Sequence, residues 1–122
     1  DPHRYSAYLE LGEPGRAVPM LLASERDLPD DYNPPARLAG VYRAMGKWDE
    51  ALAASDRALA KAYGPRKLGI YSTRLDILIG KGDIAGARVA LAAALAYADS
   101  LPAAQRSEST LAALRRKLDG VK

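Results

Sequence analysis

Small and apolar residues recur along this chain at fixed distances from three turns that each contain a glycine. The turn glycines are Gly12, Gly46 and Gly82, which are separated by 46 − 12 = 34 and 82 − 46 = 36 residues. A small residue stands five and twelve positions after each glycine, and an apolar residue stands four positions before it. A period of this length predicts an array of helical repeats. The equivalent positions are Ala17, Ala51 and Ala87; Ser24, Ala58 and Ala94; and Tyr8, Tyr42 and Leu78.

The stretches between these turns favour helix, because alanine dominates their apolar positions and has the highest helix propensity. Pro35 fits the first turn of its helix, where a missing N–H is harmless, and Asp83 is a natural N-cap. Pro19 falls near the start of the second helix, so we expect a late start or a slight kink there. Gly64 and Pro65 end the fourth helix. The expected helices cover residues 3–11, 15–27, 35–45, 49–63, 66–80, 84–98 and 103–118.

The last predicted helix does not repeat the pattern of the earlier ones. Leu111, Leu114, Leu118 and Val121 recur at spacings of three, four and three residues, while charged residues occupy the other faces. One apolar face is typical of a helix that packs on one side only. Because the terminal repeats of a stacked array need such a cover, we predict a C-terminal capping helix on the third repeat.

The small residues of the repeat are expected to have a packing role. Two antiparallel helices approach closely only where small side chains face each other, and Ala39, Ala51 and Ala58 provide such contacts in the middle repeat. Gly46 is expected to end the first helix of the pair in a left-handed conformation, which is costly for other residues. Tyr42 is expected to fill space between the two helices.

The middle repeat resembles a known family. Residues 32–65 contain the segment LAGVYRAMGKWDEALAASDRAL, which is similar to a near-consensus tetratricopeptide repeat (TPR). The resemblance covers roughly residues 3–100, and Pro19 and Arg74 depart from it. It implies an all-α, right-handed superhelix of antiparallel helix pairs in a single domain over residues 1–122, with about three repeats. The implied repeats are about 1–31, 32–65 and 66–101, followed by the capping helix at about 103–118.

Residues that carry catalytic or metal chemistry are scarce. The chain has no cysteine and one histidine, His3, which excludes disulfides, thiolate zinc sites and histidine metal sites. The adjacent carboxylates Asp30–Asp31 and Asp49–Glu50 suit a turn and a helix start, whereas a hydrolytic pair must face its substrate across a cleft. Gly80–Asp83 lacks the upstream glycine and the preceding strand of a phosphate loop. We therefore expect no enzyme activity, no cofactor and no metal.

Charge and hydropathy add little to this interpretation. The net charge is +3, and the only basic triplet, at residues 115–117, is short. Nucleic-acid binders usually carry a stronger basic footprint, and no apolar run approaches the length that spans a membrane. Since the chain starts with Asp1, we expect a fragment of a larger protein or a processed form. The alanine and arginine content is consistent with a bacterial origin, and the compartment, cytoplasm or periplasm, stays open.

In TPR folds the first helices of successive repeats line a concave groove that binds a peptide or a partner domain. Carried over residue by residue, the resemblance predicts Asn33, Arg37, Arg43, Thr73 and Asp76 as binding residues. Arg37 and Arg43 would contact carboxylates of a partner, because guanidinium offers a bidentate fork; alternatively, they are solvated or pair with Asp76. The lysine and asparagine pattern of the carboxylate-clamp TPRs is absent. The other groove positions are Ser6, Glu10, Gly40, Ala44, Ser72 and Ile79.

The resemblance thus implies a protein–protein interaction scaffold whose ligand the sequence does not name. Residues 63–102 also resemble, more weakly, the C-terminal TPR tails of bacterial thioredoxin-like proteins. That implies an accessory domain attached to a thioredoxin-like or other enzyme domain outside this chain. A nucleic-acid-binding helical repeat is a further alternative. Such proteins present base-reading side chains at fixed places in every repeat, whereas the groove positions differ between the repeats here.

Overall fold

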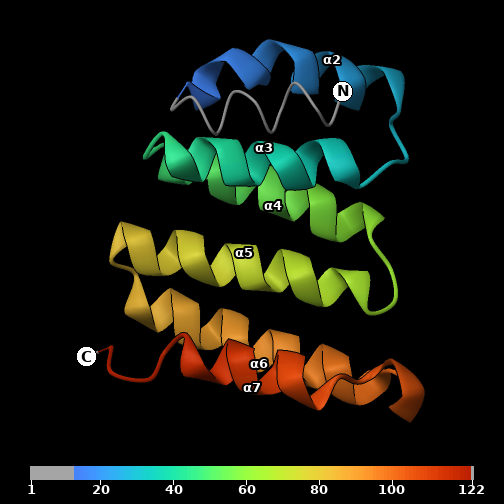
Figure 1. The fold of residues 1–122 in the computed structure, drawn as a ribbon, viewed down its shortest axis with the longest axis vertical. Coiled ribbons are helices and arrows are strands. Elements are labelled where there is room, and N and C mark those ends of the chain that lie inside the picture. Colours follow the sequence, from blue (N-terminus) through green and yellow to red (C-terminus); the bar gives the residue numbers. More distant parts are fainter. Residues whose placement is uncertain (1–12, 122) are drawn as a thin grey trace. The chain divides into compact units, whose positions relative to one another are not determined.

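The computed structural model describes residues 13–121, and every regular element in that range is helical (Figure 1). The predicted all-α class is therefore confirmed for this part of the chain. The predicted helix over residues 3–11, which includes Ser6 and Glu10, lies outside the described residues, and so does Gly12. In chain order the elements are the 3-10 turn η1 (Pro14–Ala17), α2 (Val18–Asp27), α3 (Asn33–Ala44), α4 (Trp48–Lys61), α5 (Arg66–Lys81), α6 (Ile84–Ser100), the 3-10 turn η2 (Ala103–Gln105) and α7 (Glu108–Arg116).

The chain divides into two compact units, with the boundary between Lys61 and Ala62. The first unit contains α2, α3 and α4, and the second contains α5, α6 and α7. The helices of each pair, α3 with α4 and α5 with α6, are joined by a short turn and run antiparallel (Figure 1). The repeat boundaries and the single domain are finer statements, and they stay predictions.

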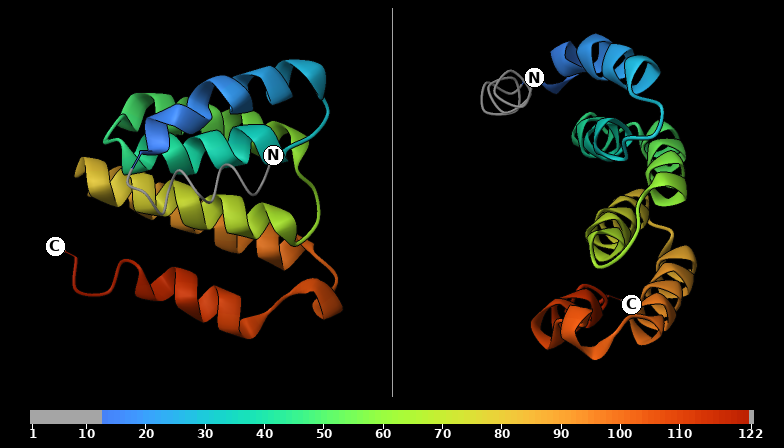
Figure 2. Two further views of the ribbon diagram at one scale, coloured as in Figure 1. Left: turned by 45° about the horizontal axis from the view of Figure 1, so that its top comes forward. Right: turned by 90° about the vertical axis from the view of Figure 1, so that its right-hand side faces the viewer.

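In the first unit, α3 packs against both α2 and α4 (Figure 2). The buried side of α3 includes Leu38, Ala39 and Val41, none of which exposes more than 1% of its surface. On α4, Ala51 and Ala58 are fully buried. Small side chains therefore lie on the buried faces of both helices, as predicted, and they allow the two backbones to approach closely.

Prolines and one side-chain hydrogen bond mark the starts of α2 and α3 in the first unit. α2 becomes α-helical only after η1, and Pro19 lies in its first turn. The predicted late start is confirmed, since proline is tolerated in a helix only where its missing N–H has no intrahelical partner. α3 begins at Asn33, whose backbone N–H donates a 2.8 Å hydrogen bond to the Asp31 carboxylate. Pro35 lies in the first turn of α3, as predicted.

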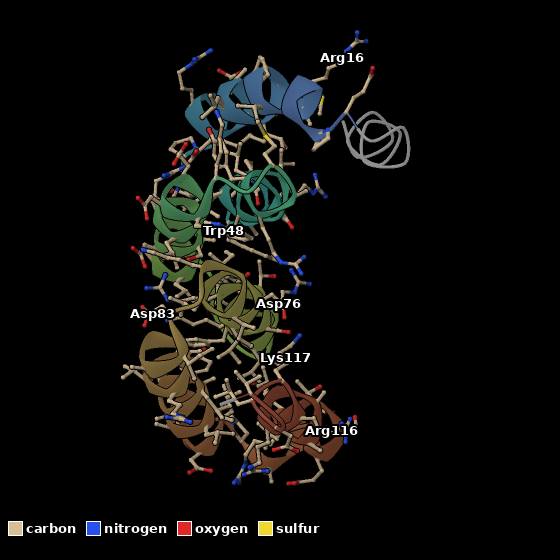
Figure 3. All side chains as sticks on the ribbon, turned by 90° about the vertical axis from the view of Figure 1, so that its left-hand side faces the viewer. Arg16, Trp48, Asp76, Asp83, Arg116 and Lys117 are labelled. Carbon is tan, nitrogen blue, oxygen red and sulfur yellow. The ribbon has the colours of Figure 1, made fainter. Side chains whose placement is uncertain are left out.

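The second unit contains a similar helix pair, α5 and α6. Gly82 ends α5 with φ = 87°, and Gly46 follows α3 in the first unit with φ = 73°. The left-handed backbone predicted at Gly46 is confirmed, and the same conformation at Gly82 explains why glycine stands there too. Asp83 caps α6, as predicted, because its carboxylate accepts a 2.8 Å hydrogen bond from the Gly86 N–H (Figure 3). The buried residues of α6 are all alanines: Ala87, Ala90, Ala94 and Ala98.

An aromatic side chain of α6 holds the loop that precedes α5. The Tyr97 hydroxyl donates a 3.1 Å hydrogen bond to the Gly64 carbonyl oxygen. The Tyr97 ring centroid lies 6.3 Å from that of Tyr71 and 4.9 Å from the Lys67 Nζ. The fourth predicted helix, 49–63, is too long, because α4 ends at Lys61 and the chain then enters this loop.

The predicted capping helix over residues 103–118 is wrong in its bounds. The structure has η2, an extended residue at Arg106, and a separate helix, α7, over Glu108–Arg116. The break has a physical cause. Ser107 is an N-cap whose hydroxyl oxygen accepts a 3.2 Å hydrogen bond from the Thr110 N–H, and this contact starts a new helix.

The α7 helix nevertheless packs on one side only, as the pattern predicted. It contacts α6 and buries Leu111 and Leu114, while Leu118 and Val121 are half-buried beyond its end. Among the helices of residues 13–121, none combines the length and the apolar character needed to cross a membrane.

Candidate functional site

Three of the predicted binding residues lie on α3. The Asn33 side-chain amide donates a 2.9 Å hydrogen bond to the Asp31 Oδ1, so it stabilises the turn that starts the helix. Arg37 is half-buried and Arg43 is exposed. Within residues 13–121, neither guanidinium forms an ion pair. Both arginines therefore retain hydrogen-bond donors for a ligand.

The positions of Arg37 and Arg43 on one helix restrict what they can contact together. They are six residues apart, so they lie about 9 Å apart along the helix axis and about 120° apart around it. The two side chains therefore flank one broad face of α3 and do not stack on each other. A ligand that contacts both must carry more than one acceptor group, as a segment with several carboxylates does.

The other two predicted binding residues lie on α5, in the second unit. The Thr73 hydroxyl donates to the Gly69 carbonyl oxygen of its own helix at 3.3 Å. Asp76 forms an ion pair with Lys117, whose Nζ lies 2.8 Å from the Asp76 Oδ1 (Figure 3). This contact links α5 to the residue that follows α7. Because the predicted residues of α3 and α5 belong to different units, their forming one groove stays a prediction.

A pocket that the sequence interpretation missed lies within the first unit. It has a volume of about 560 Å³ and opens between α2 and α4, with one residue of α3 contributing to its lining. This volume falls in the range of sites that bind small ligands. The lining residues are Leu22, Glu25 and Arg26 from α2, Tyr42 from α3, and Glu50, Ala53 and Arg57 from α4.

An ion pair connects the two walls of this pocket. The Arg57 Nε lies 2.7 Å from the Glu25 Oε2, and the Arg57 Nη2 lies 3.1 Å from the Glu25 Oε1. The Lys61 Nζ lies 3.8 Å from the same Oε2. The hydrogen bonding that Arg57 donates to the Glu25 carboxylate raises the pKa of the Arg57 guanidinium, and the partial burial of Arg57 opposes that rise. The Glu25 side chain is 14% exposed, so its carboxylate is the charge that most needs these partners.

The ion pair leaves a weak signal in the sequence. Glu25 and Arg57 are 57 − 25 = 32 residues apart, which is close to the spacing between the turn glycines. Opposite charges about one period apart indicate contact between two helices that lie about one period apart in the sequence. This signal could have pointed to α2 and α4 as the walls of a site.

Residues 13–121 contain no group of three or more histidine, aspartate or glutamate side chains arranged to hold a metal ion.

Comparison with protein-family models, curated proteins and solved structures found no match to this chain. The functional proposal therefore depends on the chemistry of the chain's own surfaces.

Proposed function

We propose that this chain is a protein-interaction module made of TPR-type helical repeats, stacked as a right-handed superhelix, and that it acts as a scaffold and not as an enzyme. The observation that carries the proposal is the recurrence of one helix pair. In each unit a left-handed glycine joins the helices, and the alanines five and twelve positions later are fully buried. Arrays of such pairs offer extended surfaces for partners. The recurring residues are Gly46, Ala51 and Ala58 in the first unit and Gly82, Ala87 and Ala94 in the second.

The favoured ligand of this module is an acidic peptide segment. Arg37 and Arg43 provide two guanidiniums on one face of α3 that form no ion pair within residues 13–121. A hydrogen bond between charged groups contributes about 1.5–3 kcal/mol, whereas an exposed ion pair within the protein contributes only about 0–1 kcal/mol. Binding therefore depends on these arginines more than folding does. Thr73 and Asp76 of α5 would add contacts if the two helices line one groove.

The test uses peptides selected from a displayed library against the full chain. Their affinity would be measured by fluorescence anisotropy for the wild type and for the double variant Arg37→Ala with Arg43→Ala. Loss of two charged hydrogen bonds predicts binding at least about tenfold weaker. The matched control is Arg88→Ala with Arg115→Ala, which removes the same charge from exposed positions of α6 and α7.

The proposal expects the control to bind like the wild type and the selected peptides to be rich in acidic residues. Equal weakening in both double variants would show a non-specific charge effect. Unchanged affinity in the α3 variant would show that these arginines do not take part, and the proposed use of this face would be abandoned.

A further inference from the structure

The pocket between α2 and α4 has an ordered arrangement of chemical groups along its length. Because α2 and α4 each run antiparallel to α3, they run in the same direction (Figure 1). The ion pair between Glu25 and Arg57 fixes how the two walls are aligned. The residues that precede Glu25 on α2 therefore lie across the pocket from the residues that precede Arg57 on α4.

The first part of that arrangement is a basic end. Arg26 follows Glu25 in the last turn of α2, on the wall opposite Arg57. Arg57 uses its Nε and Nη2 to contact Glu25, which leaves its Nη1 as a donor. Within residues 13–121, Arg26 forms no ion pair. Both oxygens of Glu25 are already engaged, so the groups left for a ligand at this end are guanidinium donors.

The remaining parts are an apolar middle and an acidic end. Leu22 lies three residues before Glu25, and Ala53 lies four residues before Arg57, so both are displaced by about 5–6 Å from the ion pair in the same direction. Leu22 is 38% exposed although it is a large apolar side chain. Glu50 lies seven residues before Arg57, about 10 Å along α4. It forms no ion pair in the part of the chain that the structure describes.

We propose that this pocket binds a short segment of a partner protein in polyproline II conformation, in which an acidic and a basic residue lie three positions apart with apolar residues between them. The carboxylate contacts Arg26 and Arg57, the apolar side chains cover Leu22 and Ala53, and the cation contacts Glu50. A polyproline II helix has three residues per turn and rises about 3.1 Å per residue, so side chains three positions apart share one face and lie about 9 Å apart, close to the separation of Arg57 and Glu50 along α4. A polyphosphate or nucleic-acid ligand fits less well, since one of its phosphates would lie beside Glu50.

This pocket is separate from the face of α3 that carries Arg37 and Arg43. Asn33, Arg37 and Arg43 do not line the pocket, so variants of each surface can be tested against the other's ligand. Failure at one surface would leave the result at the other intact.

The experiment follows amide signals of the full isotope-labelled chain by NMR while capped tetrapeptides are added at millimolar concentration. The probes are Glu-Leu-Leu-Lys and its reverse, Lys-Leu-Leu-Glu, with Lys-Leu-Leu-Lys and Glu-Leu-Leu-Glu as controls of uniform charge. We expect at least one mixed-charge peptide to shift signals of α2 and α4 in the first unit more than either control does. Equal shifts by all four peptides, or none from the mixed ones, would overturn the proposal.

A charge reversal tests which residues are used. Arg26→Glu should weaken binding of the mixed-charge peptide about tenfold, since a charged hydrogen bond is lost, and should improve binding of Lys-Leu-Leu-Lys. The matched control is Arg88→Glu, which makes the same change at an exposed position of α6 and should bind like the wild type. If Arg26→Glu leaves the preference among peptides unchanged, Arg26 does not contact the ligand and the proposed orientation is wrong.

Discussion

The substitution Ala58→Leu tests the close packing of the helix pair in the first unit. Ala58 is fully buried on α4, and α4 packs against α3, whose buried side carries Leu38 and Ala39. Leucine adds three carbon atoms at a position where the alanine exposes no surface. Because the α3–α4 turn holds the two helices together, the added volume must displace side chains or move the helices apart.

Overpacking of this kind costs about 1–3 kcal/mol. The matched control is Ala60→Leu, two residues further along the same helix, where the side chain is exposed. Alanine and leucine differ little in helix propensity, so the control should change the free energy of unfolding by less than about 0.5 kcal/mol. With a loss of about 4 °C in Tm per kcal/mol, Ala58→Leu should melt about 4–12 °C below the control.

The assay is urea unfolding followed by far-UV circular dichroism, with thermal melting as the second readout. With a urea slope of about 1–3 kcal/mol per molar for small proteins, the expected loss moves the midpoint by a readily measured amount. Ala94→Leu, with the exposed Ala96 as its control, asks the same question of α6 in the second unit. If the buried and exposed substitutions have the same effect, the helices do not meet at these alanines and the equivalence of the two pairs is refuted.

Three other substitutions or truncations have defined outcomes. Asp83→Ala removes the N-cap of α6 and should lower the free energy of unfolding by about 0.5–2 kcal/mol. Asp99→Ala, at an exposed position near the other end of α6, should lower it less. Equal losses in urea unfolding would contradict a capping role for Asp83. Tyr97→Phe removes the hydrogen bond to the loop before α5 and should lower the free energy of unfolding by about 1 kcal/mol. Its control is Tyr63→Phe, at an exposed position. If the two variants are equally stable, the Tyr97 contact does not stabilise the fold. Truncation of residues 102–122 removes α7, which contacts α6. The truncated chain should expose apolar surface of α6 and should have a lower solubility and a lower Tm. An unchanged Tm would show that α7 does not stabilise the fold.

The helix pairs could be predicted from the sequence because their packing places strict demands on single positions. A left-handed turn favours glycine, and close helix contact requires alanine, so Gly46 and Gly82 and the alanines after them recur at fixed spacings. The bounds of α7 could not be predicted in this way. The apolar spacing of Leu111 and Leu114 is the same whether the helix begins at residue 103 or at 108, and only the Ser107 side chain, acting as an N-cap, decides between them.

The candidate binding surfaces could be predicted less completely from the sequence, because they depend on which side chains meet across helices. The family resemblance predicts Asn33 and Asp76 as ligand-binding residues, and the structure adds internal contacts for both: Asn33 stabilises the start of α3 and Asp76 pairs with Lys117. The pocket in the first unit requires Glu25 and Arg57 to meet across 32 residues of chain. Periodicity within one helix carries no information about such a contact.

The two units share the residues that pack their helix pairs and differ in the charges around them. In the first unit the paired charges Glu25 and Arg57 bridge α2 and α4, whereas in the second the pair Asp76 and Lys117 connects α5 with the chain after α7. A substitution at a shared alanine is therefore expected to change stability, because it alters the contact on which each helix pair depends. A substitution at an exposed charged residue is expected to change stability less, because an exposed ion pair contributes only about 0–1 kcal/mol. Under the proposed function, selectivity for a partner should follow the charged positions at which the two units differ, and Arg26, Arg37 and Arg43 are the first to vary.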